Sequence, residues 1–464
     1  MSAPSELERG LSLRDTIALV VGTIIGTGVF LKAAVMAQHL GTPALVLAAW
    51  AAAGILSLAG ALTYAELASL LPEAGGEYVY LRQAYGSLPA FLFGWMRLTV
   101  GATGSIAIYG VAFAAFLSAV VPLDTVWARR TFPFFGQTVH WELGSKQIAA
   151  VGAIAGFSLL NCLRVTLGGR VQSILTVAKL GGIAVVVVGA FFFAPSAAWQ
   201  HLASPSTAGP VTLSAFGAAM LAALWAFDGW NNMPMVAGEV SNPARNIPRA
   251  LMVGMAVVVA VYASTNLAYF FALPFGEVVS SYSTAHPDAL PVASKTAQTF
   301  LGARGPALVS IAFILSTLGG LNGSILTNAR VPFAMARDGL LFGRFGQLHG
   351  SSRVPVFAIA VQAVWASVLA LSGTFDQLTD YVIFASWIFY AATTSAVFVL
   401  RRKMPDAARP YRTLGYPVVP LLFIGVAGWL VVNTLRTNPL ESGLGLALIL
   451  AGLPVYFYLR RPAS

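Results

Sequence analysis

The sequence predicts an all-α integral membrane protein, a single polytopic domain that extends over residues 1–464. Hydrophobic residues make up 57% of the chain and charged residues only 9%, whereas charged residues make up about a quarter of a typical soluble domain. Apolar runs recur along the whole chain, and most approach the roughly 20 residues that an α-helix needs to cross a bilayer. Strands of a membrane β-barrel would be shorter and would alternate in polarity, so that class is excluded.

Twelve of these apolar runs are predicted to be transmembrane helices. Proline, paired glycines and charged residues separate several of them, as is typical of loops at the membrane surface. In chain order the predicted spans are Ile17–Ala37, Ala44–Leu71, Leu88–Val120, Ile148–Leu163, Ile174–Phe193, Leu213–Val236, Leu251–Phe271, Ala307–Leu326, Val356–Leu371, Tyr381–Val399, Val418–Val432 and Leu444–Leu459.

The positions of Lys and Arg predict how the spans are oriented. If both termini are cytoplasmic, 18 of the 27 Lys and Arg residues fall in cytoplasmic segments and six in outside loops, and the other three lie within spans. This excess on the inside is typical of membrane proteins. We therefore expect a multi-pass protein of the cytoplasmic membrane, in contact with the lipid bilayer, with both termini cytoplasmic. The bias also accounts for the net charge of +10, so no nucleic-acid partner is expected.

The first span is interrupted by Gly22–Gly28, which reads Gly-Thr-Ile-Ile-Gly-Thr-Gly. Glycine disfavours a helix, and a break inside a membrane is tolerated only where it lines a cavity or is packed in protein. The N–H groups that begin the second half-helix could bind a carboxylate. The carbonyls that end the first half could bind an ammonium group or a cation. The alternative is that these glycines only allow close packing of helices.

The sixth span contains a second predicted break, within Leu224–Pro234. Asp228, Gly229, two asparagines and a proline all disfavour a continuous helix in the middle of this span. Aromatic residues flank the break and are large enough to cover a small ligand. Two of them, Phe227 and Trp230, are equally consistent with ordinary core packing.

The two breaks predict an internal repeat. Because five spans separate them, the second copy starts on the opposite side of the membrane, which is an inverted-topology repeat with a binding site at the midplane. The repeat units are expected to cover approximately residues 12–195 and 211–401. Two additional helices, in 414–460, lie outside the repeat.

Two basic residues within spans require separate interpretations. Lys179 lies nine residues beyond Arg170, which places it on the order of 13 Å into a hydrocarbon core of roughly 30 Å. A lysine at this depth is costly, so a functional role is expected. It could instead tether backbone carbonyls freed by a broken neighbouring helix, and the two roles are compatible. Arg97, about ten residues into the third span, is interpreted as a surface arginine whose head group reaches the interface.

Five segments resemble the amino acid–polyamine–organocation superfamily, and within it the L-type amino acid transporter family and its bacterial exchanger relatives. In family order they are Gly22–Phe30, Tyr64–Tyr80, Val171–Leu180, Leu224–Pro248 and Leu321–Asp338. The resemblance implies the LeuT-like fold, a five-plus-five inverted repeat in which helices 1 and 6 are discontinuous and helices 11 and 12 are added. It also implies that the protein transports an amino acid substrate.

The resemblance further implies a substrate site made by the two breaks. Thr27 and Gly28 would offer N–H groups to the substrate carboxylate, and the carbonyls of Ile24, Trp225 and Asp228 would receive the ammonium group. Trp225 would also act as an aromatic gate above the substrate. The substrate-binding residues would be Thr23, Ile24, Ile25, Gly26, Thr27, Gly28, Trp225, Ala226, Phe227 and Asp228.

The resemblance also gives Lys179 a role in coupling. It matches a family lysine that occupies the place of a sodium ion in sodium-coupled relatives. In this chain it would lie between the first break and the eighth span, near Ser316 or Thr317. We take Lys179 and Thr317 as the candidate coupling residues.

Two features depart from the animal members that the chain resembles. Asp228 stands where many of them carry glycine, although some bacterial members similarly have aspartate. Its carboxylate either biases the choice of substrate or caps the second half of the sixth span. The outside loop Val121–Lys146 contains no cysteine, so the disulfide that joins animal members to a glycoprotein heavy-chain subunit is not expected here.

We therefore expect a secondary active transporter of neutral L-amino acids that works by alternating access, through sodium-independent exchange. The alternatives are proton-coupled uptake, and a cationic amino acid or polyamine carrier, for which Asp228 is the candidate acidic side chain in the pocket. An enzyme is not expected, because all five histidines lie outside the spans or at their ends. We expect no metal and no cofactor, and the phosphate-binding motif that would couple transport to ATP is absent from the sequence.

Overall fold

The computed structural model describes residues 7–134, 137–194, 199–203, 211–372, 375–437 and 439–459. Within these ranges, eleven helical segments are long and apolar enough to cross a membrane, and α15 (Val356–Ser372) is a shorter apolar helix. Each predicted span overlaps one of these twelve segments, and the all-α membrane fold class is confirmed.

The first half of the chain contains the first five predicted spans. Its helices are α1 (Leu13–Ile24), α2 (Gly28–Leu40), α3 (Pro43–Leu70), α4 (Glu77–Tyr85), α5 (Ser87–Met96), the π-helix η1 (Arg97–Gly101), α6 (Ala102–Leu117), α7 (Ser145–Leu163) and α8 (Val165–Phe193). Between α6 and α7 lies an antiparallel hairpin of β1 (Val126–Phe134) and β2 (Gln137–Gly144). The sequence predicts only a loop in this segment.

The second half of the chain contains the remaining predicted spans. Its elements are η2 (Trp199–Ala203), α9 (Leu213–Phe227), η3 (Trp230–Glu239), α10 (Pro243–Ala272), α11 (Phe275–Val279), α12 (Val292–Leu301), η4 (Gly302–Arg304), α13 (Gly305–Asn328), α14 (Arg330–Arg337), η5 (Gly343–Gly346), α15, α16 (Phe375–Lys403), α17 (Val418–Thr437), α18 (Pro439–Leu450) and α19 (Gly452–Leu459).

Local sequence signals set the ends of the first helices. Ser12 and Asp15 form a capping box at the start of α1, in which the backbone N–H of each residue donates to the side chain of the other. Gly41, at φ 67°, ends α2 in the left-handed conformation that glycine adopts easily. Thr42 then caps α3, and Pro43 occupies the first turn, where its missing N–H costs nothing.

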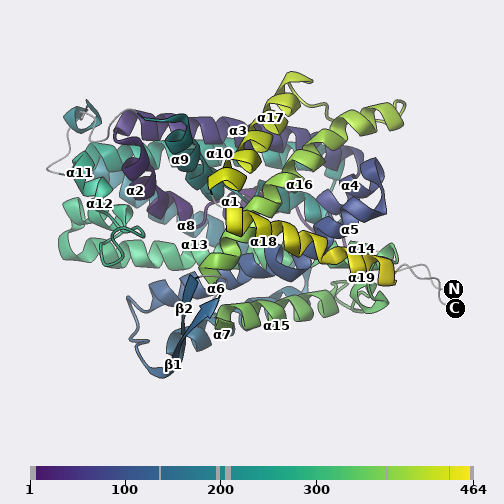
Figure 1. The fold of residues 1–464 in the computed structure, drawn as a ribbon, viewed down its shortest axis with the longest axis horizontal. Helices are drawn as coiled ribbons and strands as arrows, with labels where there is room; N and C mark the ends of the chain where they lie inside the picture. The colour runs from purple at the N-terminus through teal and green to yellow at the C-terminus, as the bar shows by residue number, and fades with distance from the viewer. Residues whose placement is uncertain are drawn as a thin grey trace.

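The long helices form two packed groups. One contains α1, α3, α9 and α10, and the other contains α6, α7, α13 and α15. In Figure 1 the labels of α3, α9 and α10 lie toward the top, and those of α6, α7 and α15 toward the bottom. The helices α1 and α13 also contact one another and α8. The broken spans therefore lie where the two groups meet.

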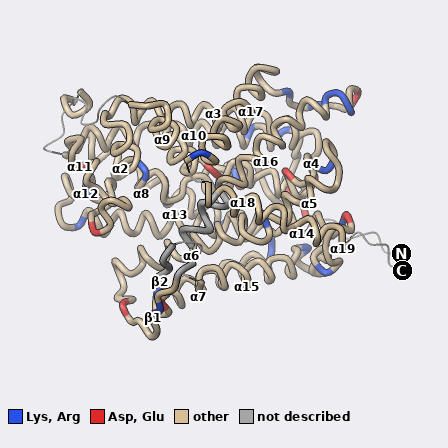
Figure 2. Tube along the Cα trace, viewed as in Figure 1, with Lys and Arg blue, Asp and Glu red and all other residues tan. Residues whose placement is uncertain are grey.

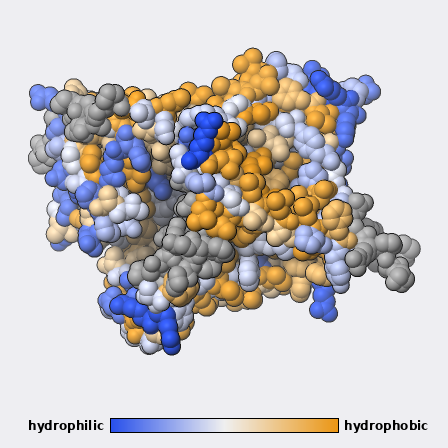
Figure 3. Space-filling view, viewed as in Figure 1, coloured by the Kyte–Doolittle hydropathy of each residue, from blue (hydrophilic) through white to orange (hydrophobic). Residues whose placement is uncertain are grey.

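The surface is consistent with a lipid environment. Most of the trace is uncharged, and the few charged segments are scattered over it, with several at the two ends of the long axis and on the hairpin (Figure 2). Hydrophobic residues cover the middle of the visible face in Figure 3. Large apolar side chains are exposed on several spans, among them Leu159, Ile174, Val177 and Val364. In a bilayer these side chains contact the lipid tails.

The two ends of the molecule are named by their helices. The α4 end is the one with α4 and α14, and the α12 end is the one with α11 and α12, at opposite sides of Figure 1. The segment η3 contacts both α4 and α14, so the second half of the broken sixth span lies toward the α4 end.

Candidate substrate site

The first span is broken over three residues. The helix α1 ends at Ile24 and α2 begins at Gly28, so Gly22 and Thr23 are still helical and the interruption is shorter than the predicted Gly22–Gly28. The N-terminus of α2 has no side-chain cap, because the hydroxyl of Thr27 makes no capping hydrogen bond. The N–H groups of the first turn of α2 are therefore directed into the break.

The sixth span is broken at Asp228 and Gly229. The helix α9 ends at Phe227, and the chain continues as the 3₁₀ segment η3, which contains Pro234. Gly229 has φ 120°, a conformation that a residue with a side chain rarely adopts. The structure thus places both interruptions where the sequence predicts them.

The two breaks contact each other directly. The hydroxyl of Thr23 donates to the carbonyl of Gly229 at 3.1 Å. The hydroxyl of Tyr262 on α10 lies 3.0 Å from the carbonyl oxygen of Ile24 and 2.7 Å from that of Ala226, so it joins the ends of α1 and α9. These contacts satisfy carbonyl groups that the breaks release from their helices.

A pocket lies between the two breaks and α6. Asp228 is exposed within this region, and its Oδ1 accepts a hydrogen bond of 2.6 Å from the hydroxyl of Tyr390 on α16. Asp228 follows α9 as its C-cap, and Gly229 precedes η3, so the carboxylate does not cap the second half-helix. The pocket is lined by Ile24, Gly26, Thr27, Gly28, Ser105, Ile108, Tyr109, Trp225, Ala226 and Asp228.

Three of the ten predicted substrate-binding residues do not line this pocket. Thr23 faces Gly229 through its side chain. Ile25 directs its carbonyl toward the Lys179 ammonium group. Phe227 packs in the core, with its ring centroid 4.8 Å from that of Tyr262. The other seven line the pocket.

The helix α6 also contributes to the pocket, which the sequence does not predict. Ser105, Ile108 and Tyr109 line the pocket, and the Tyr109 hydroxyl donates to the carbonyl of Thr23 at 3.3 Å. Their spacing places Ser105 and Ile108, and Ser105 and Tyr109, on one face of a helix. That spacing alone does not distinguish a pocket-lining face from a packed one.

Lys179 is fully buried on α8 and binds the broken backbone. Its Nζ lies 2.9 Å from the carbonyl oxygen of Gly22, 2.7 Å from that of Ile25 and 3.3 Å from that of Ser316. The Ser316 hydroxyl donates to Ile25 as well, at 2.9 Å. Thr317, predicted as a coupling partner, instead donates its hydroxyl to Ile314 of its own helix. Ser316, and not Thr317, is therefore the residue of α13 that accepts a hydrogen bond from the lysine.

Trp225 lies beside a cation. The Nζ of Lys32 on α2 is 4.4 Å from the centre of the Trp225 ring, a distance typical of a cation–π interaction. Trp225 thus connects the pocket with the second half of the first span. Its predicted role as a gate remains a proposal.

The interpretation of Arg97 as a surface arginine is wrong. Its side chain is 5% exposed, and its Nη2 donates to Asn232 at 3.0 Å and to the Asn328 side chain. The distance of a residue from the end of its span indicates a snorkelling side chain only if that side of the helix faces lipid. Here the Arg97 side chain faces η3 and α13 instead. The polar residues that receive Arg97 come from two distant spans, so no local pattern reveals them.

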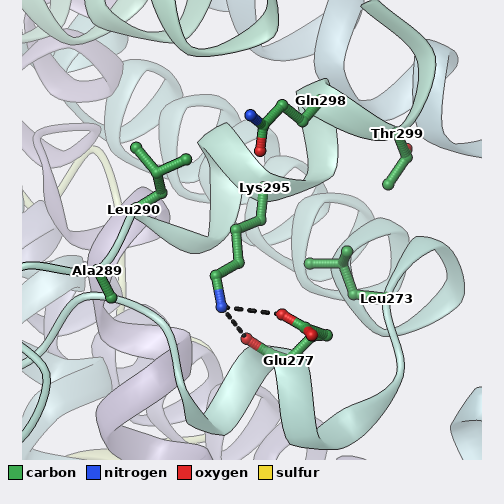
Figure 4. Close-up of a pocket in the computed structure, with 7 residues that line it drawn as sticks. All are labelled: Leu273, Glu277, Ala289, Leu290, Lys295, Gln298 and Thr299. Carbon is green, nitrogen blue, oxygen red and sulfur yellow. Dashed lines mark hydrogen bonds and ion pairs between the residues drawn. The ribbon is translucent and has the colours of Figure 1, made fainter. Parts of the chain in front are cut away.

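A second pocket, at the α12 end, has a different character. It is lined by Leu273, Glu277, Ala289, Leu290, Lys295, Gln298 and Thr299 (Figure 4). Its two charged side chains pair with each other, because Lys295 Nζ lies 3.0 Å from Glu277 Oε2 and 2.9 Å from the Glu277 carbonyl oxygen. This pairing makes it a poorer candidate for a zwitterion site than the pocket between the breaks.

Comparison with known proteins gives consistent matches over nearly the whole chain. A family model described as amino acid permease matches residues 11–452. The serine/threonine exchanger SteT of Bacillus subtilis is 33% identical over 458 residues, which cover 98% of each chain. The human cystine/glutamate transporter is 30% identical over 97% of this chain and 85% of its own length. The mouse large neutral amino acids transporter small subunit 2 is 30% identical over 97% of this chain and 81% of its own.

Proposed function

The chain belongs to the amino acid permease family, and we propose that it exchanges neutral L-amino acids across the cytoplasmic membrane without sodium. The family and the similar proteins are transporters, not enzymes. What the geometry adds is a hypothesis for how the substrate is bound and which substrates are preferred.

The observation that carries the proposal is the opposed polarity of the two helix ends at the pocket. The uncapped start of α2 presents N–H groups and a partial positive charge, which suit a carboxylate. The end of α9, at Trp225 and Ala226, carries a partial negative charge, which suits an ammonium group. The two helices pack against one another, so one α-amino acid could reach both ends.

The lining of the pocket favours small or medium neutral side chains. Ile108 and Tyr109 limit its width, and Asp228 is the acidic residue of the lining. Tyr390 already donates to one oxygen of Asp228, which leaves the other oxygen to accept from a substrate hydroxyl. The name of the Bacillus subtilis relative, a serine/threonine exchanger, supports this choice. A cationic side chain is the second candidate, because the same carboxylate could pair with it.

Lys179 supports sodium independence. Its ammonium group lies among three carbonyl oxygens of α1, the break and α13, which are the kind of ligands that a sodium ion would need. Because the Lys179 ammonium group already occupies this position, no sodium ion is needed there. Exchange is favoured over proton-coupled uptake because the ammonium group has three carbonyl acceptors, which favour its charged form.

We further propose that the α4 end faces the cytoplasm, with both termini on that side, as the distribution of Lys and Arg indicates. Alternating access would then open the pocket first toward the α12 end and next toward the α4 end. No disulfide-linked heavy-chain partner is proposed, because the single cysteine, Cys162, lies within α7.

A transport assay in proteoliposomes tests these points together. Uptake of labelled serine is measured against each of the twenty amino acids, with and without internal serine, and with sodium replaced by choline. We expect competition by small neutral amino acids, dependence on internal amino acid and no effect of choline. Competition mainly by lysine or putrescine would favour the cationic carrier. Accumulation driven by an inward proton gradient, without internal amino acid, would favour proton-coupled uptake.

A further inference from the structure

Two buried, oppositely charged side chains lie on the α4 side of the pocket and do not contact each other. Glu77 at the start of α4 is fully buried, and Arg97 in η1 is nearly so. Within the described residues they form no ion pair with one another. A buried charge without a counter-ion is expensive, so the groups that separate these two side chains are informative.

Two consecutive asparagines of the broken sixth span separate them. Asn231 Nδ2 donates to Glu77 Oε1 at 2.8 Å. Arg97 Nη2 donates to Asn232 Oδ1 at 3.0 Å. The segment η3 is therefore held on one side by a carboxyl group and on the other by a guanidinium group, each through a neutral amide.

Double glycine places Glu77 against this segment. Gly75 and Gly76 both have positive φ, at 115° and 52°. The N–H of Gly75 donates to the carbonyl of Met235 at 2.9 Å, and a Cβ on Gly76 would lie only 2.9 Å from the Met235 nitrogen. The loop before α4 thus packs backbone to backbone against η3, an approach that larger residues would prevent.

The arrangement leaves hydrogen-bonding capacity unused. Glu77 Oε2, Arg97 Nε and Asn231 Oδ1 are buried and have no hydrogen-bond partner among the described residues. Unpaired buried polar atoms are costly. A direct contact between the carboxylate and the guanidinium would satisfy two of the three, and the intervening amides of η3 prevent it here. π-helical turns such as η1 (Arg97–Gly101) are often found at functional sites.

We propose that Glu77 and Arg97 form a charge pair when η3 moves and the pocket opens toward the α4 end. While the pocket is closed toward that end, η3 keeps the two side chains apart. In this role both are positioning residues: they act on the substrate pathway through Asn231 and Asn232. The proposal assumes the opening step of the proposed function but does not depend on the identity of the substrate.

Protonation of Glu77 gives the proposal a measurable signature. Burial raises the pKa of the Glu77 carboxyl from 4.5 to about 7, against the partly offsetting effects of Arg97 and Asn231. The closed conformation therefore prefers protonated Glu77. The stability that this protonation gives the closed conformation is lost as the pH rises through about 7. Pairing with Arg97 in the open conformation would favour the ionised form. Opening should release a proton and become easier as the pH rises.

Other titratable groups also face Glu77 and must be separated from it. Arg97 carries the positive charge, and Asp228 is the neighbouring carboxylate. Three tyrosines complete the surroundings, and burial keeps the pKa of Tyr80, outside the spans, above its usual value. The groups that act on Glu77, or on which it acts, are Tyr64, Tyr80, Arg97, Asp228 and Tyr390.

The single cysteine makes a labelling experiment practical. Cys162→Ala removes the native thiol, and Ala237→Cys introduces one at a fully buried position of η3. The rate of labelling by a membrane-impermeant maleimide, added on the α4 side of the full-length protein in proteoliposomes, is divided at each pH by the rate for the denatured protein, because the thiolate is the reactive form. This normalised labelling rate reports the opening of that end between pH 5.5 and 8.5. No substrate is needed, so a wrong substrate assignment in the transport assay leaves this readout unaffected.

The expected labelling rate rises as the pH increases toward about 7, by at most about tenfold per unit for one released proton, and levels off above it, where Glu77 is already ionised in the closed conformation. Glu77→Gln, which imitates the protonated acid, should label slowly and independently of pH, and Arg97→Gln should lose most of the pH dependence. Asp228→Asn should retain it. Arg401→Gln is the matched control, because it removes a partly buried arginine from its pair with Glu66 and should keep the wild-type profile.

Three results would overturn the proposal. The first is a wild-type pH profile in Glu77→Gln. The second is loss of the profile in Asp228→Asn instead. The third is no labelling of Ala237→Cys at any pH, which would mean that this end does not open. If Glu77→Gln does not fold, Asn231→Ala is informative: removal of the spacer should let the pair form without opening and flatten the profile, whereas an unchanged profile would contradict the inference.

Discussion

Replacement of Gly28 by alanine tests how closely the two broken helices must approach. A Cβ at this position would lie 2.5 Å from Ala226 Cβ and 2.8 Å from Ala226 Cα. Carbon atoms in contact are usually about 3.5–4.0 Å apart, so α2 and α9 would have to separate by roughly 1 Å. Overpacking of this kind costs about 1–3 kcal/mol. If the whole cost appears in substrate binding, Gly28→Ala weakens affinity by about 5- to 150-fold.

Gly26→Ala is the matched control. Gly26 and Gly28 flank the same threonine and both line the pocket. A Cβ on Gly26, however, would meet the Tyr109 ring edge and hydroxyl at 3.5 Å and the Ile24 carbonyl oxygen at 3.9 Å. These are ordinary contacts, so the helices need not move. We expect Gly26→Ala to keep wild-type thermal stability and to lose less than about tenfold in affinity, because one methyl group narrows the pocket without overlap.

The assay is the thermal stability of each purified variant in detergent, measured over a series of serine concentrations. The midpoint without ligand reports packing, and its shift with ligand reports affinity. Gly28→Ala should have the lower midpoint and the smaller shift. Equal midpoints and equal shifts for the two variants would refute the argument, because they would show that α2 and α9 are not in close contact at Ala226.

Three further substitutions test other contacts of the site. Tyr262→Phe removes the hydroxyl that joins Ile24 and Ala226. Because these buried carbonyls then lack a donor, the variant should be less stable by about 1–3 kcal/mol. An unchanged midpoint of thermal unfolding would contradict this. Lys179→Ala should slow exchange in proteoliposomes, because three carbonyls lose their common donor, and a wild-type rate would exclude a role for the lysine. Trp225→Ala should reduce transport sharply and Trp225→Phe only partly, whereas equal rates in all three proteins would show that the ring only packs.

Much of the site could be predicted because broken helices leave a strong local signal. Clusters of Gly, Asn, Asp and Pro inside an apolar span are rare for a physical reason: they release backbone groups that lipid cannot satisfy. This signal located Gly26, Gly28 and Asp228, which line the pocket. Depth within a span likewise singled out Lys179, which the structure bonds to the broken backbone.

The remainder depends on how helices are rotated against one another. Ser316 and Thr317 are adjacent in the sequence, but consecutive residues point about 100° apart around a helix. Only the packing of α13 against α1 determines that Ser316 faces the lysine. Ser105 and Tyr109 were missed for the same reason, because α6 is a regular apolar helix whose inner face becomes a pocket wall only through its neighbours.

The partners of the buried basic residues indicate which contacts can change when the protein changes conformation. Arg330 is paired bidentately with Glu239, at 2.7 and 2.8 Å, with both side chains fully buried. Breaking that pair would leave two uncompensated charges, at a cost of about 3–5 kcal/mol. Lys179 and Arg97 instead bind neutral carbonyl and amide oxygens. Such partners can be exchanged for others at a smaller electrostatic cost. Sliding between the two helix groups is therefore expected at Lys179 and Arg97, while Glu239 and Arg330 move together.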